Sequence, residues 1–300
     1  MLSTLLLYTI YRQVQQQLAR IEVGTLQQHG SNGWLVAACI LMLVNLYLES
    51  HKWHRLLLWA APVSYKQALG SFLAGTSFSI ITPNRTGEYP GRILYLGGGH
   101  TFRYINVSVS GIVSQLASIW FWGLVGLVYY NLAVPATMHR LVLAGCLGIN
   151  IIIAVLYWRM YSWIPNAGKS KYLRRFAVYM QLLSRVPGSE RLRVLGLSAL
   201  RGGVFTAQYL FLLRWMNVQV PIAEGFCLAA LFFWILAVIP SFALTELGVR
   251  GAVSLYVFHH FSTNTVGILA ATGLLWLMNL ILPSVAGSIL IWRMKWVRED

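Results

Sequence analysis

Residues 82–92, with the sequence TPNRTGEYPGR, place a glutamate between two arginines in an otherwise apolar part of the chain. Glu88 and Arg92 stand four residues apart, so on a helix they share one face and can form an ion pair. A guanidinium group binds phosphate through paired hydrogen bonds, and Arg85 and Arg92 could together hold one. These residue types favour recognition of a charged group, and no catalytic residue is predicted.

A second stretch, residues 240–250 with the sequence PSFALTELGVR, carries a fainter copy of this pattern. Its proline is also followed by a glutamate, Glu246, and Arg250 stands four residues further on. Because the pattern occurs twice, we predict that both ion pairs lie in one connected polar cavity, with Arg85 at its mouth. The alternative is that each pair only holds its own helical hairpin together.

Proline and glycine in these stretches predict a break in each helical backbone. Pro83 removes a backbone donor and ends a helix, and Gly87 and Gly91 permit the tight reversal that follows. We therefore predict two broken, re-entrant helices that begin at Pro83 and Pro240. The predicted substrate-binding residues are Pro83, Arg85, Gly87, Glu88, Gly91, Arg92, Thr245, Glu246, Gly248 and Arg250.

The composition predicts that these stretches lie inside a membrane. Apolar residues make up 57% of the chain and charged residues 10%, whereas soluble domains carry about 25% charged residues. The mean hydropathy is +0.63, and several apolar runs reach the roughly 20 residues that a spanning helix needs. The predicted fold class is an all-α, polytopic integral membrane helical bundle. The net charge of +15 is attributed to cytoplasmic loops beside anionic lipid, so no nucleic-acid partner is predicted.

The apolar runs predict about seven or eight membrane segments. Residues 2–10 are interpreted as the end of a first membrane helix, truncated by the start of the chain, and residues 11–29 as an amphipathic connector. Residues 49–55 are interpreted as a basic, aromatic collar at the cytoplasmic interface. The predicted helical segments are 33–48, 65–82, 93–99, 104–132, 138–161, 195–216, 222–239, 241–261 and 265–292.

The positions of the basic loops predict an inverted-topology repeat. Residues 162–193 form a basic linker that is cytoplasmic by the positive-inside rule, and Glu190 is expected to be solvated in it. When the second stretch is laid over the first, the matched helices run in opposite directions, which is a pattern that many transporters share. We predict one domain over residues 1–300, with halves of about 1–135 and 136–300 and a cytoplasmic C-terminus.

The motif at 82–92, the Lys52-Trp53 pair before it and the later Thr245-Glu246-x-Gly248 resemble the membrane region of lysylphosphatidylglycerol synthases. That family includes stand-alone flippase-like proteins. The resemblance implies a membrane region of the kind that, in the full synthases, moves aminoacylated lipid between leaflets. In those synthases a separate soluble domain makes this lipid. Because the chain ends at Asp300, the resemblance implies lipid handling without lysyl transfer.

The expected function is therefore that of a non-enzymatic, flippase-like lipid translocase of the cytoplasmic membrane. Its predicted partners are membrane lipids, namely an anionic or zwitterionic phospholipid or a lipid-linked substrate, and a homo-oligomer or another membrane partner stays open. The alternatives are an integral-membrane transferase or accessory subunit for lipid-linked glycan assembly, and a membrane scaffold. No cofactor or metal is predicted, because Cys39, Cys146 and Cys227 are widely spaced in apolar runs and no metal or dinucleotide motif occurs.

Overall fold

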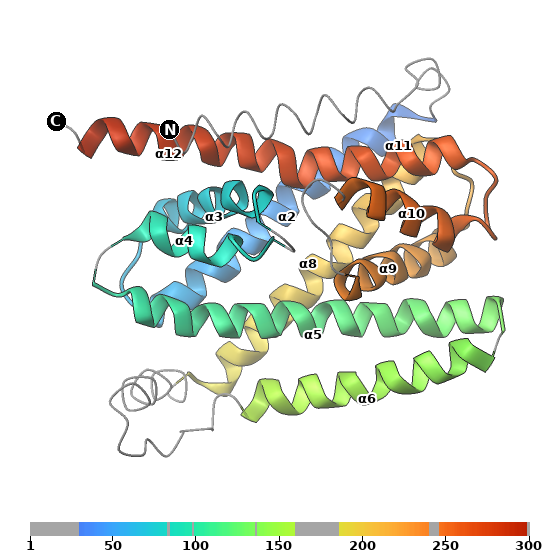
Figure 1. The fold of residues 1–300 in the computed structure, drawn as a ribbon, viewed down its shortest axis with the longest axis horizontal. Coiled ribbons are helices and arrows are strands. Elements are labelled where there is room, and N and C mark those ends of the chain that lie inside the picture. Colours follow the sequence, from blue (N-terminus) through green and yellow to red (C-terminus); the bar gives the residue numbers. More distant parts are fainter. Residues whose placement is uncertain are drawn as a thin grey trace.

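The computed structural model describes residues 30–82, 85–97, 99–135, 137–159, 186–239 and 246–298, and the described backbone contains helices and no strands (Figure 1). The all-α prediction is thereby confirmed. The helices are α2 Asn32–Leu58, α3 Tyr65–Ile80, α4 Glu88–Leu96, α5 Thr101–Ala133, α6 Thr137–Arg159, α8 Gly188–Trp215, α9 Ile222–Val238, α10 Glu246–Phe258, α11 Thr265–Trp276, the π-helical η3 Leu277–Ile281 and α12 Leu282–Arg298.

Four of the described helical segments are long and apolar enough to cross a membrane. They are α2, α5, α6 and the continuous run from α11 into α12, Thr265–Trp292. α9 is apolar but shorter. Together with the composition, these segments make the protein an integral membrane protein with several spans.

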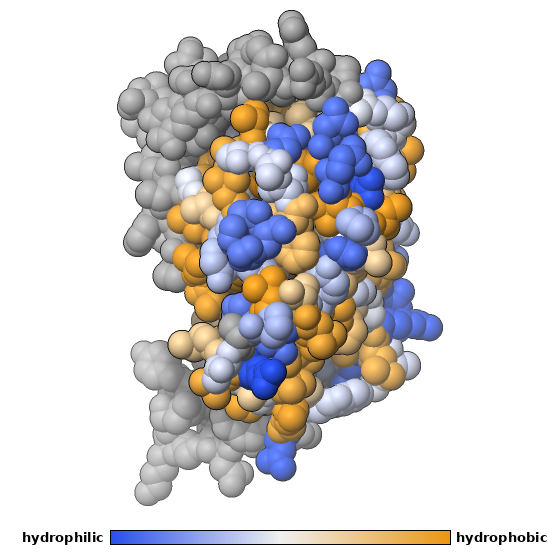
Figure 2. All heavy atoms as spheres, turned by 90° about the vertical axis from the view of Figure 1, so that its right-hand side faces the viewer, coloured by the Kyte–Doolittle hydropathy of each residue, from blue (hydrophilic) through white to orange (hydrophobic). Residues whose placement is uncertain are grey.

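Loop contacts define the two ends of the bundle. At one end, Gly30 donates a hydrogen bond to the carbonyl of Trp215, and Asn264 donates one to that of Met216. That end therefore carries the start of α2 and the α8–α9 and α10–α11 connections, and it faces the viewer in Figure 2, where hydrophilic side chains gather among hydrophobic ones. At the opposite end, Arg55 near the end of α2 pairs with Glu190 in the first turn of α8.

α3 and α4 form an antiparallel hairpin that starts and ends at the Arg55 end of the bundle (Figure 1). The contacts of small residues show the direction, since Gly70 lies against Tyr95, and Phe78 lies against Gly91. α9 and α10 start and end at the opposite end. The two hairpins therefore enter the bundle from opposite ends, and their tips face each other in its middle.

The chain is interrupted where two broken helices were predicted. α3 ends at Ile80 and α4 begins at Glu88, and α9 ends at Val238 before α10 begins at Glu246. Pro83 and Pro240 lie outside the described residues, so the structure does not show what they do. The inverted repeat itself stays a prediction, as does the division of the chain into two halves.

The predicted end of the first described helix was wrong. α2 continues through residues 49–55 to Leu58, and Glu49, Lys52 and Trp53 are buried instead of lying at a water interface. A charged run within an apolar chain indicates an interface only when no other helix supplies partners. Here Arg92 of α4, Gln115 of α5 and Arg201 of α8 supply them.

Small residues bring α12 close to α3, and α5 close to α8. Ser77 of α3 donates a hydrogen bond of 2.6 Å to the carbonyl of Ser284 in α12, and Ser284 donates one to the carbonyl of Thr76. Between α5 and α8, Ser118 donates to the carbonyl of Ser198. Small residues at such contacts allow close helix packing in lipid, where apolar burial adds little between helices.

Candidate functional site

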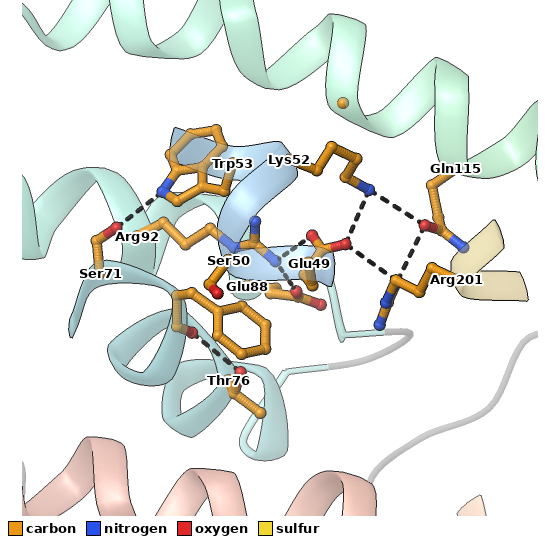
Figure 3. Close-up of polar contacts among 12 residues, drawn as sticks. Glu49, Ser50, Lys52, Trp53, Ser71, Thr76, Glu88, Arg92, Gln115 and Arg201 are labelled. Carbon is orange, nitrogen blue, oxygen red and sulfur yellow. Dashed lines mark hydrogen bonds and ion pairs between the residues drawn. The ribbon is translucent and has the colours of Figure 1, made fainter. Parts of the chain in front are cut away.

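Glu49, on α2, is the centre of a buried ion cluster (Figure 3). Its carboxylate lies 2.8 Å from Lys52 Nζ on the same helix, 2.9 Å from an Arg92 nitrogen on α4, and 3.2 Å from an Arg201 nitrogen on α8. The side chains of Glu49, Lys52 and Arg92 are 3%, 1% and 1% exposed. One carboxylate thus joins three cations from three helices, which offsets part of the cost of burying them.

Arg92 is enclosed on all sides by its own partners. It forms ion pairs with Glu49 and with Glu88, four residues earlier on α4. The faces of Trp53, Phe72 and Tyr89 lie 4.8 to 5.2 Å from its guanidinium carbon. These rings cover Nε and one terminal nitrogen, which are buried without a hydrogen-bond acceptor, and provide cation–π attraction in their place.

A chain of polar side chains leads from the Glu49 cluster across the bundle. Arg201 donates to Asn45 Oδ1 on α2 and to Gln115 Oε1 on α5, both at 2.9 Å. Lys52 donates to the same oxygen of Gln115 (Figure 3). Asn45 in turn donates to Asn279 Oδ1 at 3.0 Å, so the polar chain links four separate helical segments.

Asn279 lies in the π-helical segment η3, four residues before Pro283. Proline has no backbone N–H to bond to the carbonyl four residues earlier, so a helix next to it widens or bends. Asn279 donates to Gln208 Oε1 and also to the carbonyl of Leu275. The irregular turn therefore directs one amide side chain into the polar chain.

A second ion cluster joins the tips of the two hairpins. Arg85, in the turn before α4, and Arg250, on α10, both lie 2.8 Å from Oε1 of Glu246. Arg85 has a left-handed backbone conformation with φ of 57°, which non-glycine residues rarely adopt and which its surroundings must hold in place. Its ion pair with Glu246 is one contact that does so.

A cavity of about 50 Å³ lies between the two clusters. Its polar lining comes from Arg85, Arg201, Asn45 and Asn279, and its apolar lining includes Phe72. A space of this size holds a few water molecules, because each needs roughly 10–15 Å³ by this measure. The cavity is therefore too small for a lipid headgroup, which would require the surrounding helices to separate.

The predicted ion pairs form, but they are arranged differently from the expectation. Glu88 pairs with Arg92 and Glu246 with Arg250, as their spacing predicts. The four side chains lie in two clusters, and the cavity between these is lined by Arg85 instead. The structure does not bring Arg92 together with Arg85 to hold one phosphate, because Arg92 is taken up by two carboxylates and three rings.

Of the glycines predicted to bind substrate, two lie in tight contacts within the α3–α4 hairpin and one lies on an exposed face of α10. A side chain at Gly87 would lie within 2.8 Å of Thr82, and one at Gly91 within 2.8 Å of Phe78, so both allow α4 to pack on α3. Gly248 is exposed on α10, and a side chain there would meet open space. Pro83 and Thr245 lie outside the described residues.

Sequence reasoning missed several residues of this site. The sequence pattern places Glu49 and Lys52 at an interface, and it does not single out Arg201, Asn45, Gln115 or Asn279. The available signal was an isolated charged or amide residue within an apolar run, as Arg201 is in α8. Such residues are costly at membrane depth and are functional candidates for that reason.

The expectation for Glu190 was wrong. Residues 188–193 belong to α8 instead of a solvated linker, and Glu190 accepts hydrogen bonds of 2.8 to 3.1 Å from Arg55. Arg193 donates a further one at 2.7 Å. Glu190 therefore connects α8 to α2 at the Arg55 end of the bundle.

Comparison with known proteins agrees with the resemblance seen in the motif. A family model described as the lysylphosphatidylglycerol synthase TM region matches residues 1–287. A comparison with curated proteins finds none that matches. The match covers nearly the whole chain, including both hairpins, both ion clusters and the cavity between them. The chain therefore belongs to the lysylphosphatidylglycerol synthase transmembrane-region family.

Proposed function

We propose that this protein binds the headgroup of a phospholipid or another lipid-linked substrate and moves it between the leaflets of the cytoplasmic membrane. The observation that carries this proposal is the cavity beside the tip of the α3–α4 hairpin, which two arginines, Arg85 and Arg201, line within the bundle. Charged side chains at membrane depth are costly and commonly mark a substrate path. Lipids are the charged molecules that surround such a path within the membrane.

The arrangement of the hairpins supports movement as well as binding. They enter from opposite ends, and their tips are joined by one ion pair, Arg85 with Glu246, across the middle of the bundle. If each hairpin moved away from the other in turn, the cavity would open first toward one leaflet and then toward the other. Sites of this kind, between broken helices near the midplane, occur in many transporters.

The orientation belongs to the same proposal. The end of α6, the start of α8 and the far end of α12 lie toward the same end of the bundle (Figure 1), which is also where Arg55 pairs with Glu190. The sequence that connects α6 to α8 is basic. By the positive-inside rule this end is cytoplasmic. The α3–α4 hairpin would then enter from the cytoplasm and the α9–α10 hairpin from the opposite side.

Reconstitution into vesicles with headgroup-labelled phospholipids tests the function. The label in the outer leaflet is destroyed by a membrane-impermeant reductant, and a translocase makes the inner-leaflet label accessible as well. The Arg201→Gln protein should move less lipid than the wild type, while Arg140→Gln, at an exposed position on α6, should match it. No protein-dependent movement of any labelled lipid, or chemical modification of the headgroup, would overturn the proposal.

A further inference from the structure

The two ion clusters contain more positive than negative charge. Five cationic side chains, Lys52, Arg85, Arg92, Arg201 and Arg250, face three carboxylates, Glu49, Glu88 and Glu246. Within the described residues, no other carboxylate pairs with any of the five. Charged side chains at membrane depth are costly, so an excess of two positive charges within the bundle favours the binding of an anion.

The excess lies at the cavity. Lys52 and Arg92 are 1% exposed, whereas the cavity-lining side chains of Arg85 and Arg201 are 34% and 24% exposed. One terminal nitrogen of each is still available, since Arg85 bonds Glu246 through Nε and NH2, and Arg201 bonds its partners through Nε and NH1. Neither remaining nitrogen has a hydrogen-bond partner in the part of the chain that the structure describes.

The geometry points to a phosphate-binding site, and we propose that a phosphate group binds in the cavity between Arg85 and Arg201. Guanidinium groups suit phosphate because their planar donors match its oxygens. Asn45 and Asn279 add amide dipoles to the same lining. This inference rests on the proposed function, because the phosphate there is that of a lipid headgroup, but a free phosphate ion has the same chemistry.

Arg85 is the side chain that can change partners. Its two bonds to Glu246 join the hairpin tips beside the cavity, and Glu246 keeps Arg250 if Arg85 leaves. A phosphate that binds the remaining terminal nitrogen of Arg85 and then also takes its other donors would replace Glu246 and separate the tips. Arg201 is held by Asn45, Gln115 and Glu49 and stays as the fixed half of the site.

Binding is measured on the full-length protein in a phosphate-free maltoside detergent at constant ionic strength. The probes are inorganic phosphate, dihexanoyl phosphatidylglycerol and dihexanoyl glycerol, which has the same acyl chains without phosphate. Arg85→Gln and Arg201→Gln should each weaken binding of the phosphate-containing probe about tenfold or more, the loss expected for a hydrogen bond between charged groups. Arg140→Gln should leave the affinity unchanged.

The three probes separate the sources of the phosphate. Binding of phosphatidylglycerol that depends on both arginines supports a lipid phosphate at this site. Binding of inorganic phosphate with the same dependence, and none of phosphatidylglycerol, supports the site but contradicts the lipid function. Equal binding of dihexanoyl glycerol and phosphatidylglycerol, or unchanged affinity in both arginine variants, overturns the proposed site.

Two further measurements distinguish loss of the phosphate site from loss of folding and from loss of lipid movement. Both arginine substitutions leave each carboxylate a remaining cation, because Glu49 keeps Lys52 and Arg92, and Glu246 keeps Arg250. If Arg201→Gln does not yield folded protein, Arg201→Lys keeps the charge but removes the paired donors, and weaker phosphate binding is again expected. Wild-type lipid movement by both folded glutamine variants would overturn the phosphate site while leaving translocation standing.

Discussion

Arg85 and Glu246 are 161 residues apart in the sequence, yet they form an ion pair of 2.8 Å between the tips of two hairpins. Each comes from one of the two stretches that share proline, glutamate and arginine. The pair is a direct link between these stretches, and it lies beside the cavity that Arg85 lines.

We expect the hairpin tips to move apart during transport. In a variant without Cys39, Cys146 and Cys227, Arg85→Cys and Glu246→Cys can be joined by a short, reducible crosslinker. Crosslinked protein should lose lipid movement and regain it after reduction. Unchanged movement in fully crosslinked vesicles would show that the tips stay together. The uncrosslinked double-cysteine protein is the control for losing the ion pair itself.

Glu49 should matter more for stability than Glu88, although only Glu88 belongs to the motif. Glu49→Gln leaves Lys52, Arg92 and Arg201 without their shared carboxylate and should cost about 3–5 kcal/mol. Glu88→Gln should cost about 1 kcal/mol, because Glu88 is 26% exposed and Arg92 keeps Glu49. Unfolding of the purified variants in a denaturing detergent measures the difference, and equal losses would contradict it.

Although its effect on stability is small, Glu88→Gln should still reduce lipid movement. It raises the positive excess of the Glu49 cluster and removes one of the two carboxylates that pair with Arg92. The protein should remain inserted at the wild-type level. The vesicle assay measures this effect, with Arg140→Gln as the charge-changing control at an exposed position. Wild-type movement by Glu88→Gln would remove Glu88 from the functional residues.

Substitution of the motif glycines by alanine should destabilise the protein at Gly91, which lies in a helix contact, and not at Gly248. Gly91→Ala places a methyl group 2.7 Å from the Phe78 side chain and should destabilise the α3–α4 hairpin by about 1–3 kcal/mol. Gly248→Ala meets open space on an exposed helix face and should be neutral or stabilising by up to about 1 kcal/mol. Detergent unfolding distinguishes them, and a loss of substrate binding in a fully stable Gly248→Ala would instead indicate a binding role.

Glu190→Gln should weaken the contact between α2 and α8. Arg55 would lose a charged partner that is 14% exposed, so we expect a cost of about 1 kcal/mol. A double-mutant cycle with Arg55→Gln measures the pair. Additive effects of the two single changes would show that the ion pair contributes nothing, and coupling of about 1 kcal/mol would support it.

Much of the architecture could be predicted from the sequence. The length of the apolar runs determines that the chain is helical and membrane-spanning, because a backbone in lipid must satisfy its own hydrogen bonds. Proline and glycine between apolar runs located both interruptions, and the spacing of four residues determined the pairs Glu88–Arg92 and Glu246–Arg250. These are local properties, so they can be read from neighbouring residues alone.

Only the tertiary structure decided which charges meet across helices. The sequence around Glu49 and Lys52 is that of an interfacial collar, and nothing near them indicates that Arg92 and Arg201 are their partners. Likewise, Arg85 stands three residues before Glu88 in the sequence but pairs with Glu246. A charged residue at membrane depth must find a partner, but which partner it finds depends on how distant helices pack, and that packing is not encoded in local spacing.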